Sequence, residues 1–219
     1  MITYESLKHN EEIRTYIRCA DDSLRALGFT EHSFAHVTRV SETAAEILST
    51  LGYDDHTVEL TRIAGYLHDI GNLVNRVDHS QSGAVMAFRI LDRLGMPPKD
   101  IATIVTAIGN HDEGTGVPVS GVAAALILAD KSDVRRSRVR NSDFSTFDIH
   151  DRVNYSVTAS SLVLDPEEKT VTLTLEIDTT VASVMSYFEI FLGRMVMCRK
   201  AADKLGLQFK LNINGQMLI

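Results

Sequence analysis

The chain has 219 residues, 44% of them hydrophobic, which is enough to bury the core of one large domain or of a medium domain with a small appendage. A formal net charge of -7 argues against a protein whose whole surface follows a nucleic-acid backbone, so no nucleic-acid partner is expected. The charged first residues show no secretory signal, and Cys19 and Cys198 have neither disulfide-framework nor zinc-knuckle spacing, so we expect a cytoplasmic protein.

Apolar residues at helical spacing predict helices through the first two thirds of the chain. These helices are expected over residues 5–27, 33–51, 54–71, 80–95, 98–111 and 119–134. Most are followed by a glycine, as is common where helices end, and Gly71 is expected to stop the third. The last is hydrophobic nearly all round, which indicates a central position.

The pattern changes after residue 148. Residues 153–164 and 170–177 alternate apolar and polar side chains around the turn sequence DPEEK, which predicts a β-hairpin. A long helix over residues 181–206 and a third strand over residues 209–214 are expected to follow. The uncharged part of that helix is shorter than the ~20 residues that a membrane span needs, so no membrane partner is expected.

The predicted fold is therefore mainly α. A helical domain over residues 1–148 is followed by a small α+β module (β-β-α-β) over residues 149–219, whose role the sequence does not indicate. The long helix of this module carries an apolar patch formed by Met185, Phe188, Phe191, Leu192 and Met195. The patch favours either a homo-oligomer or, as the preferred interpretation, packing on the module's own hairpin.

Polar, metal-capable residues lie near the ends of the predicted helices or within an apolar helix. They are His36, His68, Asp69, His79, His111 and Asp130. A carboxylate among alanines and leucines, such as Asp130, is costly unless it is paired, hydrogen-bonded or coordinates a cation. Neutral imidazoles with carboxylates suit divalent ions such as Mn, Fe, Zn, Co or Ni, and open coordination positions suit hydrolysis. Each residue alone also has a structural interpretation: His68 and Asp69 as a helix end, Asp130 as the partner of a following arginine.

The ordered set of His36, then His68-Asp69, then Asp130, resembles the HD-domain superfamily of metal-dependent phosphohydrolases over roughly residues 30–140. The resemblance implies an all-helical bundle in which these four residues bind a divalent metal ion. Subfamilies with two further histidines hold two metals bridged by the aspartate of the pair, and His79 and His111 stand in the matching order. The resemblance thus implies one or two divalent ions (Mn, Fe, Zn, Co, Ni or Mg), with Asp69 as a catalytic residue.

The motifs that distinguish subfamilies indicate a class of substrate but not a particular compound. The sequence GNHDEGTGVP is similar to a shortened HHE...DGxGYP region of cyclic-di-GMP phosphodiesterases, but Asn110 replaces a histidine. Leu73 and Val74 stand where guanosine-tetraphosphate hydrolases carry Glu-Asp. The extra histidines resemble those of bacterial diadenosine-tetraphosphate hydrolases, which favours a nucleotide or dinucleoside polyphosphate by analogy.

The segment KSDVRRSRVR places basic residues directly after Asp130 in an otherwise acidic chain. At helical spacing Lys131, Arg135 and Arg138 share a face, and we take Lys131 and Arg135 as candidate catalytic residues that bind phosphate. The alternative for this segment is a solvated helix end. The general acid is left open among Asp112, Glu113 and Asp133.

The sequence therefore predicts a metal-dependent phosphohydrolase that cleaves a phosphoester or phosphoanhydride of a small molecule, with a nucleotide as the favoured class, through a metal-activated water. The alternative is a non-catalytic nucleotide- or metal-binding sensor on the same fold. In that case the C-terminal module would transmit the bound state to a partner.

Overall fold

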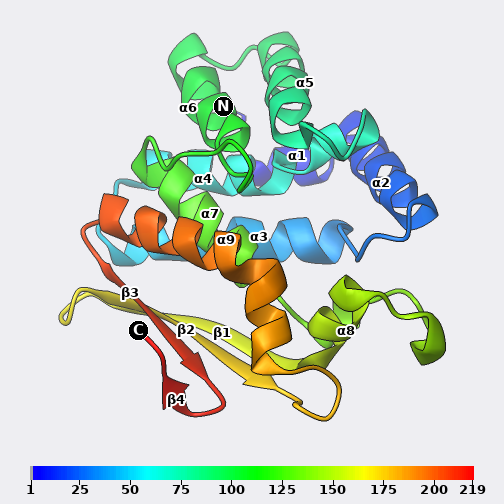
Figure 1. Cartoon of the computed structure of the whole chain (residues 1–219). Coiled ribbons are helices and arrows are strands. Elements are labelled where there is room, and N and C mark those ends of the chain that lie inside the picture. Colours follow the sequence, from blue (N-terminus) through cyan, green and yellow to red (C-terminus); the bar gives the residue numbers. More distant parts are fainter. Residues whose placement is uncertain (1) are drawn as a thin grey trace.

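The computed structural model describes residues 2–219 and shows a helical bundle packed against a small sheet (Figure 1). Its α-helices are α1 Tyr4–Lys8, α2 Glu11–Ala26, α3 Phe34–Thr50, α4 Asp55–Leu67, α5 His79–Arg93, α6 Pro98–Gly109, α7 Gly121–Ser132, α8 Ile149–Ser156 and α9 Val184–Lys204. Short 3-10 helices cover η1 Ile70–Leu73, η2 Arg136–Arg138 and η3 Phe144–Thr146. The predicted mainly α class, with a strand-containing C-terminal part, is confirmed.

The sheet lies at the C-terminal end of the chain and has the strand order β1-β2-β3-β4. Its strands are β1 Val157–Asp165, β2 Thr170–Ile177, β3 Gln208–Ile213 and β4 Gln216–Met217. β1 and β2 pair as the predicted antiparallel hairpin, whereas β2 and β3 are parallel and are connected through α9. The short strand β4 pairs antiparallel with β3 and extends the predicted β-β-α-β order by one strand.

Two predicted boundaries differ from the structure. The first expected helix is divided, because α1 ends at Lys8 and the side chain of Asn10 caps α2 by accepting a hydrogen bond from the Ile13 amide. The predicted first strand begins too early, since residues up to Ser156 form α8. Asp148 caps that helix by accepting from the Asp151 amide, a local signal that the apolar and polar alternation obscured.

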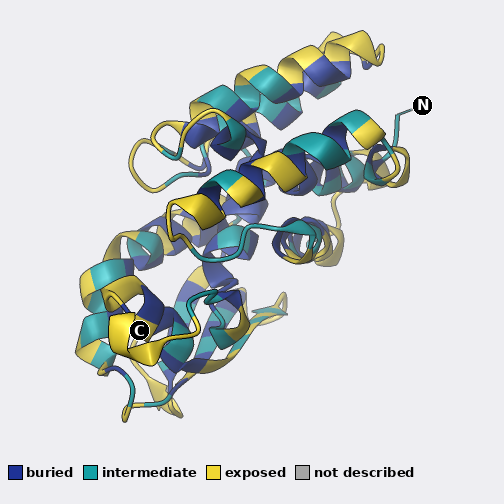
Figure 2. Ribbon diagram, turned by 90° about the vertical axis from the view of Figure 1, so that its right-hand side faces the viewer, coloured by how far each residue is buried: buried dark blue, intermediate teal, exposed yellow. Residues whose placement is uncertain are grey.

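The hydrophobic core is continuous from the bundle into the sheet. α7 is central, as predicted: it packs against α3, α4, α6 and α9, and every residue from Val122 to Ala129 is buried. The same buried cluster extends to Leu173 of β2 and Leu211 of β3. Figure 2 shows this interior in dark blue, with exposed residues on the outer helix faces.

The predicted apolar patch of α9 is only partly buried. Phe191 and Met195 are buried, whereas Met185 and Leu192 are exposed. Within residues 2–219 no helix is long and apolar enough to cross a membrane.

Gly71 has a different role from the predicted helix stop. α4 ends at Leu67, and Gly71 lies in η1, where the chain packs closely against the start of α5. A Cβ at this position would overlap the His79 carbonyl oxygen and the Gly83 amide nitrogen. The absence of a side chain therefore lets the turn after Asp69 approach His79.

We expect Gly71→Ala to lower the free energy of unfolding by about 3 kcal/mol, because only a backbone shift can relieve the overlap. Gly193→Ala is the matched control: at that helical glycine a Cβ would meet no heavy atom within 4 Å, and the change should stabilise by up to about 1 kcal/mol. Urea denaturation of both variants checks the difference. Equal stability of Gly71→Ala and the parent would contradict the close-packing argument.

Candidate metal centre

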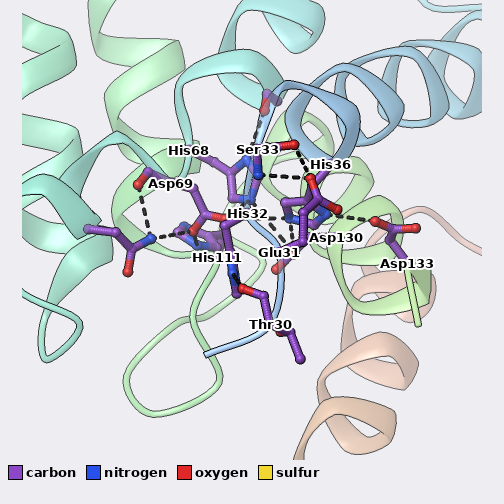
Figure 3. A network of polar contacts seen from close by, with 12 residues as sticks. Thr30, Glu31, His32, Ser33, His36, His68, Asp69, His111, Asp130 and Asp133 are labelled. Carbon is purple, nitrogen blue, oxygen red and sulfur yellow. Dashed lines mark hydrogen bonds and ion pairs between the residues drawn. The ribbon is translucent and has the colours of Figure 1, made fainter. Parts of the chain in front are cut away.

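The structure brings the six predicted ligand residues together in one cluster, and most come from helix ends. His36 lies in the first turn of α3, His68 and Asp69 follow the end of α4, and His79 begins α5. His111 follows α6, and Asp130 lies near the end of α7. Figure 3 shows the labelled members of this His/Asp cluster pointing toward one another.

The Asp69 carboxylate lies at the centre of the cluster. Its Oδ2 atom is 3.4 Å from His36 Nε2 and 3.2 Å from His68 Nε2. Its Oδ1 atom is 3.5 Å from His79 Nε2 and 4.0 Å from His111 Nε2. The two carboxylate oxygens of Asp69 therefore face two different pairs of imidazoles.

Asp130 completes the first group of donors. Its Oδ1 atom is 3.3 Å from His36 Nε2 and 3.7 Å from His68 Nε2. In the second group, the Nε2 atoms of His79 and His111 are 3.2 Å apart. Donor atoms that bind one divalent ion at about 2.1 Å lie about 3.0 to 3.5 Å from one another. The spacing of both groups is close to that range.

The histidines are oriented by hydrogen bonds at their other ring nitrogens. Each Nδ1 atom lies near an oxygen acceptor: His36 near Asp133 Oδ2 at 2.7 Å, His68 near the Gly65 carbonyl at 2.8 Å, His79 near the Arg76 carbonyl at 3.0 Å and His111 near the Ile108 carbonyl at 2.7 Å. A proton on Nδ1 leaves the Nε2 lone pair facing the cluster, as in histidines that bind metals.

Buried atoms without hydrogen bonds lie between these rings. Among residues 2–219, His36 Nε2, His68 Nε2 and Asp69 Oδ2 are buried and have no hydrogen-bond partner. Such atoms are rare in folded proteins, and three that converge fit a divalent cation held by the first group. The second group differs, because Arg76 Nη1 lies 3.3 Å from His79 Nε2 and can donate to it.

The pKa shifts show that the first group of donors favours positive charge. Burial raises the pKa of Asp69, but the imidazoles of His68 and His36 outweigh it and hold that pKa well below its usual range. Burial lowers the pKa of His68, whereas the carboxylates of Asp69 and Asp130 raise it to about 10. The carboxylates therefore remain ionised and face the point where a cation would bind.

A cavity of about 410 Å³ opens beside the cluster. It is lined by Asp69, His79 and Asp130, by basic side chains from several elements, and by apolar side chains of the loop after α2 and of α9. The basic residues are Arg76, Lys131, Arg138 and Arg194, and the apolar ones include Leu27, Phe29, Ile190 and Phe191. Its size lies within the range typical of small-molecule sites.

Lys131, the predicted phosphate-binding lysine, lies in this cavity wall. Its Nζ atom is 2.7 Å from Asp130 Oδ2 and 2.6 Å from Glu113 Oε2. Burial lowers the pKa of Lys131, but both carboxylates raise it further, so the residue is a cation. Burial likewise raises the pKa of Glu113, while Lys131 and Arg194 lower it to about 2. Glu113 is therefore ionised near neutral pH and is not a suitable proton donor.

Arg135 lies outside the cavity, in contrast to the predicted placement. Helical spacing placed Lys131, Arg135 and Arg138 on one face, but α7 ends at Ser132 and Arg135 has extended backbone geometry. Its guanidinium contacts Asp133, with Nε 2.8 Å from Oδ1, and Glu31 at 3.3 Å. Arg135 thus supports the carboxylate that orients His36 and does not line the cavity.

We expect Asp133→Asn to weaken metal binding by about 10- to 100-fold, because Asp133 accepts the hydrogen bond that orients His36. The measurement is the dissociation constant for Mn²⁺ or Zn²⁺ by competition with a chromogenic chelator. Asp143→Asn, at an exposed helix cap away from the cluster, is the control and should bind like the parent. Unchanged affinity in Asp133→Asn would remove Asp133 from the orienting role.

Arg194, Arg76 and His32 also line the cavity, and no sequence pattern assigned them a role. Arg194 carried a usable signal, since it is a lone charge within an apolar stretch of α9. The other two lie in loops, where no periodicity marks the side that they face.

Comparisons with known proteins place the chain in a family. The family described as the HD domain matches residues 33–143. An uncharacterized protein of Methanocaldococcus jannaschii is 25% identical over 183 residues, which cover 73% of this chain and 68% of that protein. The crystal structure of a predicted HD superfamily hydrolase from an uncultured Thermotogales bacterium is 30% identical. That match covers 58% of this chain and 69% of the other, with a TM-score of 0.45.

Proposed function

Because the chain belongs to the HD domain family, we propose that it is a metal-dependent phosphohydrolase that cleaves a phosphoester or phosphoanhydride of a small molecule. Family membership supports a metal-dependent hydrolase in general. The observation that carries the proposal is the pair of donor groups that meet at the two oxygens of Asp69. The phosphorylated substrate and the residue roles are inferred from the chemistry of the cavity.

The cluster offers places for two divalent ions. His36, His68, Asp69 Oδ2 and Asp130 would hold one, and Asp69 Oδ1, His79 and His111 would hold the other. The nitrogen and oxygen donors suit Mn, Fe, Zn, Co, Ni or, with more oxygen ligands, Mg. A divalent ion bound there supplies a water of lowered pKa, from ~16 toward ~7, and polarises a phosphoryl oxygen.

The protein's own residues would position the substrate and neutralise its charge. Lys131 presents an ammonium at the cavity wall, held between Asp130 and Glu113, where phosphate oxygens can accept hydrogen bonds. Asp133 orients His36, and Asp133 is itself held by Arg135 and by contact with Arg138. This arrangement keeps the donors in place before a substrate binds, which reduces reorganisation during the reaction.

A nucleotide is the substrate class that we propose. Beside its charged region, the cavity has an apolar wall that includes the exposed ring of Phe29 and the side chain of Ile190, a surface suited to a planar base. Asp148, Asp151 and Asn154, in and beside α8, line another part and offer acceptors for amino or hydroxyl groups. A volume of about 410 Å³ suits a ligand of that size.

The proposal is tested by metal analysis of the purified protein and by hydrolysis assays with added Mn²⁺, Fe²⁺ or Zn²⁺. The assay panel contains a chromogenic phosphodiester, a phosphomonoester, nucleoside phosphates and a dinucleoside polyphosphate. We expect one or two metal ions per chain and turnover of at least one nucleotide that a chelator abolishes. Metal-loaded protein that hydrolyses nothing in the panel contradicts the proposal, and nucleotide binding without turnover supports the sensor alternative.

A further inference from the structure

The C-terminal segment supplies part of the cavity wall, although it lies outside the residues that match the HD domain. Ile190, Phe191 and Arg194 of α9 line the cavity together with Lys131 of α7. Figure 1 shows α9 passing over α7, so this part of the wall is continuous with the helix that carries Asp130. The module's contribution to the cavity includes one cation, Arg194.

A chain of ionic contacts joins Arg194 to the His/Asp cluster. Arg194 Nε donates to Glu113 Oε1 at 3.1 Å, and Glu113 Oε2 is 2.6 Å from Lys131 Nζ. Lys131 Nζ is in turn 2.7 Å from Asp130 Oδ2. The guanidinium of Arg194 also lies over the Phe191 ring, with 4.3 Å between Cζ and the ring centroid. Arg194 is therefore held from two sides.

Most of the hydrogen-bonding capacity of Arg194 is unused. A guanidinium has five N–H donors in a fixed plane, and within residues 2–219 only Nε of Arg194 has an acceptor. Its side chain is 23% exposed and lines the cavity, and neither terminal nitrogen is among the buried atoms, so both can be reached by a ligand there. The other arginine deep in the wall, Arg138, differs: its Nε and Nη1 donate to the carbonyls of Glu31 and Asp133.

Pairing with Glu113 alone does not account for this arrangement. Lys131 shares its single charge between Glu113 and Asp130. Arg194 Nε therefore adds to the neutralisation of Glu113, but the terminal nitrogens of Arg194 take no part in that pair. A partly buried guanidinium that leaves its terminal donors free is suited to a planar, two-point contact with an anion.

We propose that Arg194 binds a phosphate oxygen of the substrate, so that the C-terminal segment completes the site. The proposal rests on the phosphohydrolase function inferred above. Lys131 and Arg194, bridged by Glu113, then form a pair of cations, one from each predicted part of the chain. Lys131 supplies a point charge, and Arg194 supplies the directional donors that orient the phosphate.

Inorganic phosphate is the probe for this role, and Arg199→Met is the matched control because Arg199 is an exposed arginine of the same helix. Calorimetry on the metal-loaded full chain should show phosphate binding weakened about 10- to 100-fold in Arg194→Met. Arg199→Met should match the parent, and all variants should keep the parent's metal content. For a phosphomonoester substrate, we expect KM to rise in Arg194→Met and Arg194→Lys to fall between that variant and the parent.

Parental phosphate affinity in Arg194→Met overturns the proposal, as does a parent that binds no phosphate. If Arg194→Met loses metal or unfolds, Arg194→Lys is the deciding variant. Weakened phosphate binding by Arg194→Lys with full metal content supports the proposal, and phosphate binding as tight as in the parent overturns it. The proposed function is judged separately by turnover in the parent. A parent that binds phosphate through Arg194 without hydrolysing any substrate removes only the phosphohydrolase function.

Discussion

Asp69→Asn is expected to abolish metal binding and hydrolysis together. The two oxygens of Asp69 face both imidazole pairs, at 3.2 Å from His68 Nε2 and 3.5 Å from His79 Nε2. Asparagine has nearly the same size, but it carries no negative charge. Its amide oxygen can face only one imidazole pair, and its NH2 group is a donor that cannot bind a cation. Elemental analysis and the hydrolysis assay on the same preparation measure both effects.

The metal content of His79→Ala distinguishes a centre that holds one metal ion from a centre that holds two. If each oxygen of Asp69 serves one ion, this variant should retain about one metal ion per chain where the parent holds two. His56→Ala removes an exposed histidine that contacts Asp100 and should keep the parent's metal content. Full metal content in Asp69→Asn would refute the proposed ligand set. Loss of all metal in His79→Ala would indicate a single, shared centre.

Lys131→Met is expected to lower the free energy of unfolding by about 3 kcal/mol and to weaken phosphate binding. The substitution preserves much of the apolar stem of the side chain but leaves Asp130 and Glu113 without their common cation in a buried region. Removing one member of a buried ion pair is costly because the remaining charge is uncompensated. Urea denaturation of the metal-loaded protein gives the change in stability.

A double variant shows whether the loss of stability in Lys131→Met arises from the carboxylate of Glu113. Adding Glu113→Gln removes one of the two carboxylates that have lost Lys131, so Lys131→Met/Glu113→Gln should be about 1 kcal/mol more stable than Lys131→Met alone. Phosphate binding should stay weak in the double variant, since the cation is still missing. A Lys131→Met variant as stable as the parent would contradict the buried ion pair.

Much of the fold could be predicted because helices and strands leave periodic patterns in the sequence. The apolar spacing predicted the main helices of the bundle, and the alternation around DPEEK predicted the β1–β2 hairpin. The break at Asn10 and the helix α8 were missed, because each depends on a side-chain cap that competes with a longer pattern. The proposed boundary at residue 148 stays a prediction; the buried cluster has members on both sides of it, such as Val134 and Val153.

The sequence by itself determined the residue types and the order of the His/Asp cluster, since His36, His68-Asp69 and Asp130 were recognisable by their resemblance to the HD-domain pattern. Only the tertiary structure decided which atoms converge. Asp69 faces both imidazole pairs because helix ends from α3, α4, α5 and α6 meet there. Arg135 turns away because α7 ends at Ser132, whereas Arg194 joins the cavity from a distant helix. Periodicity describes one element at a time, and the direction of a loop or the contact of two helices depends on the packing of the whole chain.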